Sequence, residues 1–233
     1  MKTVGIIGGI GPESTVYYYQ RIIKEYKKRT KSKHYPNINI ASIDMTEMLS
    51  YEENREYDEL ENMLSLAVDR LMKASSDFVV IASNTPHVVF DRLEKVAAVK
   101  LISIVDSTCE YIKKKGYKKA LLTGTLYTMQ ENFYSRYAIK YNFDLIVPGR
   151  EDMLNIQDVI FPELEEGIII PEKKEKYIRI VEKYAKEQGI DCVILGCTEL
   201  PLMISDKDVS IPAINTSEIH VQKIVDEMLA ATD

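Results

Sequence analysis

Two matching segments constrain the fold of this chain more than any other feature. Asp77–Ser83 and Asp191–Cys197 each begin with aspartate, continue through an apolar run and end in a small residue. Their last residues lie 114 positions apart, and Gly9 and Gly124, which follow two earlier apolar strands, lie 115 positions apart. Such similar offsets indicate a duplicated unit.

Short apolar segments alternate with amphipathic stretches along the whole chain. The pattern predicts strands near 3–7, 38–43, 77–82, 101–105, 119–123, 143–147, 191–195 and 211–214. It predicts helices near 13–30, 58–73 and 152–166, near 172–188 and 216–229, and three more that end near 96, 115 and 141. Strands that alternate with helices form parallel sheets with helices on both faces.

We therefore expect an α/β fold made of two similar parallel-sheet lobes related by a pseudo-two-fold axis. The first lobe is expected to comprise 1–103 plus 212–233, and the second 104–211. Open α/β sheets bind ligands beyond the carboxyl ends of their strands. We expect these ends to face one another, so that the active site lies in the cleft between the lobes.

Composition restricts the function classes. A chain of 233 residues with 45% hydrophobic content can bury a large core, and its net charge of -6 argues against a nucleic-acid partner. No run of about 20 apolar residues is present, which excludes a membrane span. The three cysteines have neither an even count nor metal-ligand spacing, so we expect no metal and a reducing, cytoplasmic location.

Cys197 is the principal catalytic candidate. The strand before it stops at Gly196, which delivers Cys197 and Thr198 to the carboxyl end of the sheet, and Pro201 follows in the next helix start. A helix N-terminus lowers the pKa of a cysteine, so we expect a reactive thiolate. The alternative is a buried structural thiol, and the matching position of Ser83 favours the catalytic interpretation.

Two proton-transferring groups on opposite sides of a cleft suit one reaction class. They can remove a proton from one face of a carbon and return it on the other, as racemases and epimerases require. Backbone and hydroxyl donors near helix starts would stabilise the carbanion, and the glycine turn lets backbone approach a ligand. The expected substrate-binding residues are therefore Gly9, Ile10, Gly11, Asn84, Thr85, Thr125, Thr128 and Thr198.

Three motifs resemble signatures of the aspartate/glutamate/hydantoin racemase superfamily, specifically its aspartate racemase branch. They are Gly8–Pro12, Ser83–His87 and Gly196–Glu199, and the resemblance extends to Gly124–Thr128 and Asn215–His220. It implies two α/β lobes, often a dimer, no pyridoxal or other cofactor, and an acidic amino acid as substrate. It also implies two catalytic cysteines that act on opposite faces of the α-carbon.

Only one of those cysteines is present here, because Ser83 stands at the first position. A serine hydroxyl has far too high a pKa to act as a base near neutral pH, although some branch members have a threonine there. The hypothesis is asymmetric racemisation, with Cys197 as the acid/base and Ser83 as a proton donor. Arg55, or more weakly Arg150, is the candidate for binding the side-chain carboxylate.

Several alternatives stay open. A decarboxylase of the same superfamily needs only one thiol, because one face of its carbanion is protonated. A cis-trans isomerase of that superfamily is another alternative, and a non-catalytic amino-acid-binding protein needs no thiol. Glu199 could cap its helix or orient Cys197, and His87 could act in catalysis or only bond a helix start. The segment around Glu165 is expected to form a solvated helix face.

Overall fold

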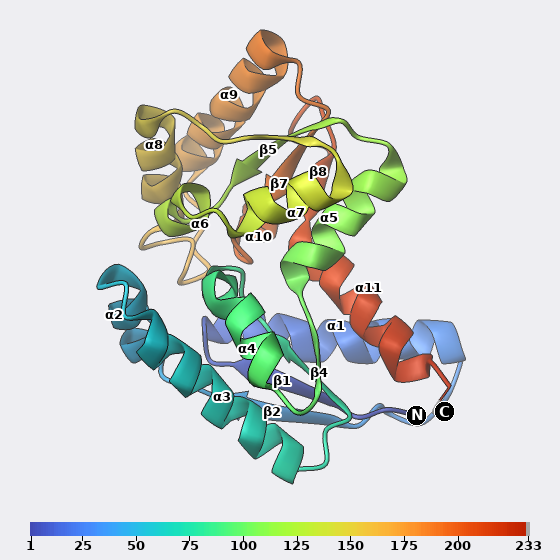
Figure 1. Ribbon diagram of the computed structural model, residues 1–233. Coiled ribbons are helices and arrows are strands. Elements are labelled where there is room, and N and C mark those ends of the chain that lie inside the picture. Colours follow the sequence, from blue (N-terminus) through green and yellow to red (C-terminus); the bar gives the residue numbers. More distant parts are fainter. Residues whose placement is uncertain (232–233) are drawn as a thin grey trace. The chain divides into compact units, whose positions relative to one another are not determined.

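The computed structural model describes residues 1–231 and divides into two compact units. One unit is Met1–Ile104 together with the chain from Ser217, and the other is Val105–Thr216 (Figure 1). Each unit contains one four-stranded parallel sheet with flanking helices. The expected α/β fold with two parallel-sheet lobes is confirmed.

The first unit has strand order β2-β1-β3-β4. Its elements are β1 (Val4–Gly8), α1 (Pro12–Thr30), β2 (Ile38–Ser42), α2 (Met45–Glu53), α3 (Tyr57–Lys73), β3 (Phe78–Ile81), the 3-10 helix η1 (Thr85–Val89), α4 (Phe90–Val96), β4 (Lys100–Ile102) and α11 (Thr216–Leu229).

The two faces of this sheet are covered by different helices. Neighbouring residues of a strand point to opposite faces, and Ile6 and Ile7 therefore enter different cores. Ile6 packs in a cluster with residues of α1 and α11, whereas Ile7 packs with residues of α2, α3 and α4. All five residues of β1 are buried, as expected for a central strand of a parallel sheet.

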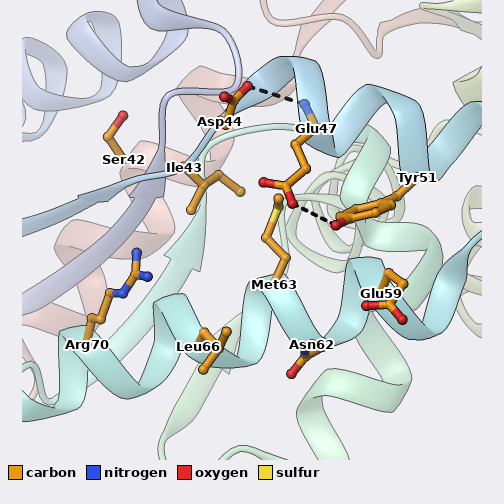
Figure 2. Close-up of a pocket in the computed structure, with 10 residues that line it drawn as sticks. All are labelled: Ser42, Ile43, Asp44, Glu47, Tyr51, Glu59, Asn62, Met63, Leu66 and Arg70. Carbon is orange, nitrogen blue, oxygen red and sulfur yellow. Dashed lines mark hydrogen bonds between the residues drawn. The ribbon is translucent and has the colours of Figure 1, made fainter.

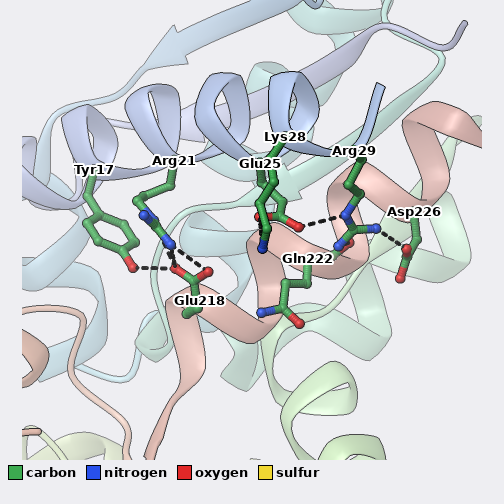
Figure 3. Close-up of polar contacts among 8 residues, drawn as sticks. All are labelled: Tyr17, Arg21, Glu25, Lys28, Arg29, Glu218, Gln222 and Asp226. Carbon is green, nitrogen blue, oxygen red and sulfur yellow. Dashed lines mark hydrogen bonds and ion pairs between the residues drawn. The ribbon is translucent and has the colours of Figure 1, made fainter. Parts of the chain in front are cut away.

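Polar contacts between α1 and α11 help to hold the last helix in the first unit (Figure 3). Glu218 accepts hydrogen bonds from Arg21 at 2.6–2.9 Å and from Tyr17 Oη at 3.0 Å. Further along, Arg29 pairs with Asp226. Because these charges are partly exposed, each pair contributes roughly 0–1 kcal/mol, and most of the stability comes from the apolar cluster beneath them.

The second unit has strand order β6-β5-β7-β8. Its elements are α5 (Ile104–Lys115), β5 (Lys119–Thr123), α6 (Leu126–Gln130), α7 (Phe133–Tyr141), β6 (Asp144–Ile146), α8 (Arg150–Ile160), α9 (Pro171–Gln188), β7 (Cys192–Leu195), α10 (Leu200–Met203) and β8 (Ala213–Asn215).

Several elements differ from the sequence-based expectation. The polar stretch after β2 forms α2, because Asp44 caps it by accepting hydrogen bonds from two backbone N–H groups. The helix expected over 152–166 ends at Ile160, since Pro162 keeps the residue before it extended. The strand expected to reach 105 stops at Ile102.

The chain also changes units later than expected. β8 pairs with β7 in the second sheet, so residues 213–215 lie there although the sequence-based boundary was placed at 211. Leu195 of β7 pairs in register with Asn215 of β8. In residues 1–231, no helix combines the length and the apolar character that crossing a membrane would require.

Candidate active site

The carboxyl ends of β1 and β3 bring two of the predicted motifs together in the first unit. These strands are neighbours, with Ile7 paired to Ile81. Gly9 has φ +86, and a Cβ added to it would lie 2.5 Å from both Ser42 Oγ and the Ile43 carbonyl oxygen. Only glycine fits this position without strain, so the turn after β1 depends on it.

Ser83 lies two residues beyond β3, and its side chain is half-buried. The strand end just before it is fixed by Ser14 of α1, whose hydroxyl donates to the Ala82 carbonyl at 2.8 Å. The adjacent Asn84 is 2% exposed. The first unit therefore places Ser83 beside the glycine turn at the same edge of the sheet.

His87 supports this loop as a neutral side chain. Its Nδ1 lies 3.1 Å from the Asn84 carbonyl oxygen, and its Nε2 accepts from the Ile104 N–H at 3.4 Å. This arrangement requires the proton on Nδ1. Burial, with a smaller contribution from His220, lowers the pKa of His87 to about 3. These contacts favour the helix-start role over an acid/base role.

In the second unit, the equivalent edge is formed by the ends of β5 and β7. Gly196 N–H donates to the Thr123 carbonyl at 2.7 Å, and a Cβ on Gly196 would lie 2.6 Å from that same oxygen. Thr123 Oγ1 donates to the Ile194 carbonyl at 2.8 Å, and Thr216 Oγ1 donates to the Leu195 carbonyl at 2.9 Å. These bonds fix the strand end that delivers Cys197.

Cys197 is 5% exposed and makes a specific polar contact. Its Sγ donates to Glu199 Oε2 at 3.0 Å, and Thr198 Oγ1 lies 2.8 and 2.9 Å from the two oxygens of the same carboxyl. The Glu199 side chain makes no capping bond to α10. Of the two roles left open for Glu199, the structure therefore supports the orientation of Cys197.

The expected lowering of the Cys197 pKa is wrong. Burial raises the pKa of this thiol well above its ordinary value, and the nearby charges of Glu199 and Glu165 raise it further. The helix that follows, α10, has only four residues, so its dipole offers little compensation. Cys197 is therefore a protonated thiol at rest, with a carboxylate in position to take its proton.

Glu165 is a functional candidate that the sequence did not reveal. It was expected on a solvated helix face, but α8 ends five residues earlier, and Glu165 lies half-buried in the turn that follows. Burial, and secondarily the charge of Glu199, raises the pKa of Glu165 to about 8. Nothing in its local sequence indicates this position, because the fold of 161–167 brings it to Cys197.

The three side chains around the thiol form a compact set of potential ligands. One ligand atom each from Glu165, Cys197 and Glu199 lies within 4.8 Å of the others. Zinc binds both cysteine sulfur and carboxylate oxygen, so the donor types alone are compatible with a metal. The hydrogen bond from the thiol to Glu199 and the raised pKa of Glu165 agree better with a shared-proton arrangement.

Thr125 and Thr128 bond mainly to each other. Thr125 Oγ1 caps α6 by accepting from the Thr128 N–H at 3.2 Å, and it donates to Thr128 Oγ1 at 3.1 Å. Thr128 is fully buried, and its methyl group packs closely against Gly124 and Gly196. Both threonines thus support the loops of the second unit in this structure.

The remaining predicted residues lie as follows. The Ile10 side chain is buried in the core, which leaves only its backbone for a ligand, and Gly11 precedes α1 as its N-cap. Thr85 begins η1. Arg55 is exposed with φ 57 just after α2, and Arg150 is exposed at the start of α8. Cys109 and Cys192, expected in the core, are fully buried.

Sequence comparison assigns this pair of sheets and motifs to a known family. The Asp/Glu/Hydantoin racemase family matches residues 7–224. The chain belongs to this family. Among its relatives is the broad specificity amino-acid racemase RacX of Bacillus subtilis (strain 168), which is 23% identical over 97% of this chain and 98% of the relative.

Solved structures agree with this membership. An aspartate racemase homologue from Pyrococcus horikoshii OT3 is 37% identical, with a TM-score of 0.86 over 99% of this chain and 100% of that structure. Picrophilus torridus aspartate racemase has a TM-score of 0.77 at 23% identity, over 100% of this chain and 96% of that one. The family member described here is therefore an amino-acid racemase in fold and sequence.

Proposed function

We propose that this protein racemises an acidic amino acid, aspartate or also glutamate, without pyridoxal phosphate or another cofactor. The observation that carries the proposal is the hydrogen bond from Cys197 Sγ to the buried Glu199 carboxyl, at the carboxyl end of β7. A thiol with an adjacent proton acceptor has the parts of an activated acid/base pair.

In the proposed reaction, Cys197 passes its proton to Glu199 Oε2, and the resulting thiolate takes the α-proton of the substrate. The carbanion is then protonated on its other face by Ser83 Oγ, and the resulting alkoxide regains a proton from water, into which Glu199 releases the proton that it took from the thiol. In the reverse direction the same steps run backwards: Ser83 gives its proton to water and takes the α-proton, the Cys197 thiol protonates the carbanion, and Glu199 returns a proton to the thiolate. Membership of the Asp/Glu/Hydantoin racemase family supports the reaction class, racemisation.

Glu165 and Arg55 are the proposed contacts for the substrate carboxylates. Because its pKa is raised to about 8, Glu165 is largely a neutral acid at pH 7 and can donate a hydrogen bond to a carboxylate. Arg55 would supply the positive charge. Backbone N–H groups of the Gly9–Gly11 turn, with Asn84, Thr85 and Thr198, are the proposed donors that complete the site.

The deciding experiment measures α-proton exchange in deuterated water with L- and D-aspartate and with L- and D-glutamate, and with arginine and alanine as non-acidic comparison substrates. Exchange accompanied by inversion supports the proposal, and exchange with arginine or alanine alone would refute the acidic substrate. The hydroxyl at Ser83 favours one alternative, a single-thiol decarboxylase. That enzyme would release carbon dioxide from the dicarboxylic substrate, and its product would carry one solvent deuteron.

Two further features belong to this proposal. Free, buried thiols at all three cysteines suit a reducing compartment, and we place the protein in the cytoplasm on that basis. We also expect a homodimer, which gel filtration with light scattering would test.

A further inference from the structure

A pocket of about 250 Å³ lies within the first unit. One side is formed by the last residue of β2 and the start of α2, and the other by one face of α3 (Figure 2). Ligand pockets commonly measure roughly 300–1,000 Å³, so this one suits a small occupant. None of the residues that line it is among the catalytic or substrate-binding candidates described above.

The α3 side of the pocket is charged at both ends and apolar between them. Glu59, Met63, Leu66 and Arg70 follow one another at spacings of four, three and four residues, which places them on one helix face. Glu59 is at one end and Arg70 at the other. Leu66 is 50% exposed although it is apolar, so the middle of this face presents a hydrophobic surface.

Arg70 provides an anion-binding end. Figure 2 shows its side chain extended from α3 toward β2, in the direction of Ser42. Within residues 1–231 its guanidinium has neither an ion-pair partner nor a hydrogen-bond acceptor. A guanidinium binds a carboxylate through two parallel hydrogen bonds, so an unpaired arginine in a pocket favours a carboxylate ligand.

Carboxylates gather at the other end. Glu47 accepts a hydrogen bond from Tyr51 Oη at 2.7 Å, and Asp44 caps α2 at 2.8 Å from the Thr46 nitrogen. Glu59 has no hydrogen-bond or ion-pair partner in the part of the chain that the structure describes. Glu47 and Glu59 therefore make this end of the pocket negative, and a negative end attracts a cation such as an ammonium group.

We propose that this pocket binds a small zwitterion, an ω-amino acid about as long as 6-aminohexanoate, whose carboxylate pairs with Arg70 and whose ammonium lies near Glu47. Its aliphatic part would cover Met63 and Leu66. The charge order of the pocket matches such a ligand end for end, whereas a plain anion or a plain cation would satisfy only one end.

The pocket also adjoins the glycine turn. Ser42 and Ile43 line it, and the same two residues are the ones that a Cβ on Gly9 would meet at 2.5 Å. Because packed groups transmit small displacements, a ligand seated against Ser42 would shift the Gly9 turn. The pocket is thus an effector site placed next to the turn after β1.

The test is calorimetric titration of the full chain with 6-aminohexanoate, and with hexanoate and hexylamine as single-charge probes. 6-Aminohexanoate is achiral and has no α-stereocentre to invert. The titration is repeated on the Cys197→Ala variant, so that binding at this pocket is measured without racemase activity. We expect the zwitterion to bind about tenfold or more tightly than either probe. Equal affinities for all three, or no binding at about 10 mM, would overturn the proposal.

Variants locate the site. Arg70→Gln and Glu47→Gln should each weaken zwitterion binding about tenfold or more, while the matched control Arg179→Gln, an exposed arginine of α9, should leave it unchanged. The Gly9 amide donates to Thr15 Oγ1 at 2.8 Å, and its NMR resonance should shift on saturation of the wild type but not of Arg70→Gln. An unshifted Gly9 resonance would overturn the coupling, and unchanged affinity in Arg70→Gln would overturn the site.

Discussion

The two units share a strand order but differ in the chemistry at the ends of their strands. β2-β1-β3-β4 and β6-β5-β7-β8 are the same parallel arrangement, with the third strand of each unit preceding Ser83 or Cys197. Around Ser83 the supporting groups are neutral, since His87 has a pKa of about 3. Around Cys197 they are two carboxyl groups, Glu199 and Glu165.

This difference shows that a repeated fold can place two side chains at equivalent strand ends while their pKa values are set by other groups. Both strand ends are pinned by side-chain hydrogen bonds to main-chain carbonyls, from Ser14 in the first unit and from Thr123 and Thr216 in the second. The acid/base character of each position then depends on the groups that later loops supply. Cys197, after β7, has a proton acceptor in Glu199. Ser83, after β3, has none among the contacts described above.

In the proposed reaction Cys197 of the second unit removes the α-proton, so the loss of its thiol should have the largest effect. Cys197→Ala should reduce α-proton exchange by about 10³-fold or more, because it removes the acid/base group. The measurement is deuterium incorporation at the α-carbon by NMR. Cys192→Ala, on the buried strand, is the matched control, and a similar loss in both variants would indicate damage to folding.

Removing the proton acceptor should have the next largest effect. Glu199→Gln should reduce the rate about 10²-fold and lower the pKa of the Cys197 thiol, since a charge that disfavours the thiolate is lost. The pH dependence of iodoacetamide alkylation reports this pKa. A slower enzyme whose thiol pKa is unchanged would contradict the pairing, and Glu199→Asp should retain part of the activity.

A variant with a thiol after both β3 and β7 tests the difference between the two units directly. Ser83→Cys should raise the exchange rate about tenfold, because a thiol is a far better proton donor than a serine hydroxyl. Initial rates with both enantiomers are the measurement. Slower exchange in both directions would refute the proposed role of Ser83, and Ser83→Ala shows how much the hydroxyl contributes.

A smaller effect concerns stability in the first unit. Glu52 of α2 is 2% exposed, and its Oε1 has no hydrogen-bond partner in residues 1–231. Burial, and then the charge of Glu53, raises the pKa of Glu52 to about 8. An unfolded carboxyl ionises near pH 4.3, so the folded chain retains this proton longer, and stability from this group falls as pH rises from about 4 to 8.

Glu52→Gln should therefore stabilise the protein by about 1–3 kcal/mol at pH 8.5 and by much less at pH 4.5. Urea unfolding at the two pH values measures the difference. Glu94→Gln, at an exposed position of α4, serves as the control and should show a much smaller dependence on pH. A gain that is equal at both pH values would contradict a buried, raised-pKa carboxyl.

Much of the fold could be predicted because strand and helix patterns are local. The strand Lys119–Thr123 and the last helix, which ends at Leu229, have the predicted bounds, and the repeated aspartate-apolar pattern located Ser83 and Cys197. The motifs around these residues also indicated the racemase family, which the comparisons confirm. These features depend on residues close together in the sequence.

Tertiary structure decided the state of the thiol. The sequence placed Cys197 before a helix and predicted a lowered pKa, but burial and two carboxyl groups raise it. Glu165 is 32 residues from Cys197, and no local pattern shows that a turn after α8 brings it there. Acidity depends on the solvent and charges that surround a group, and these are set only when distant segments pack together.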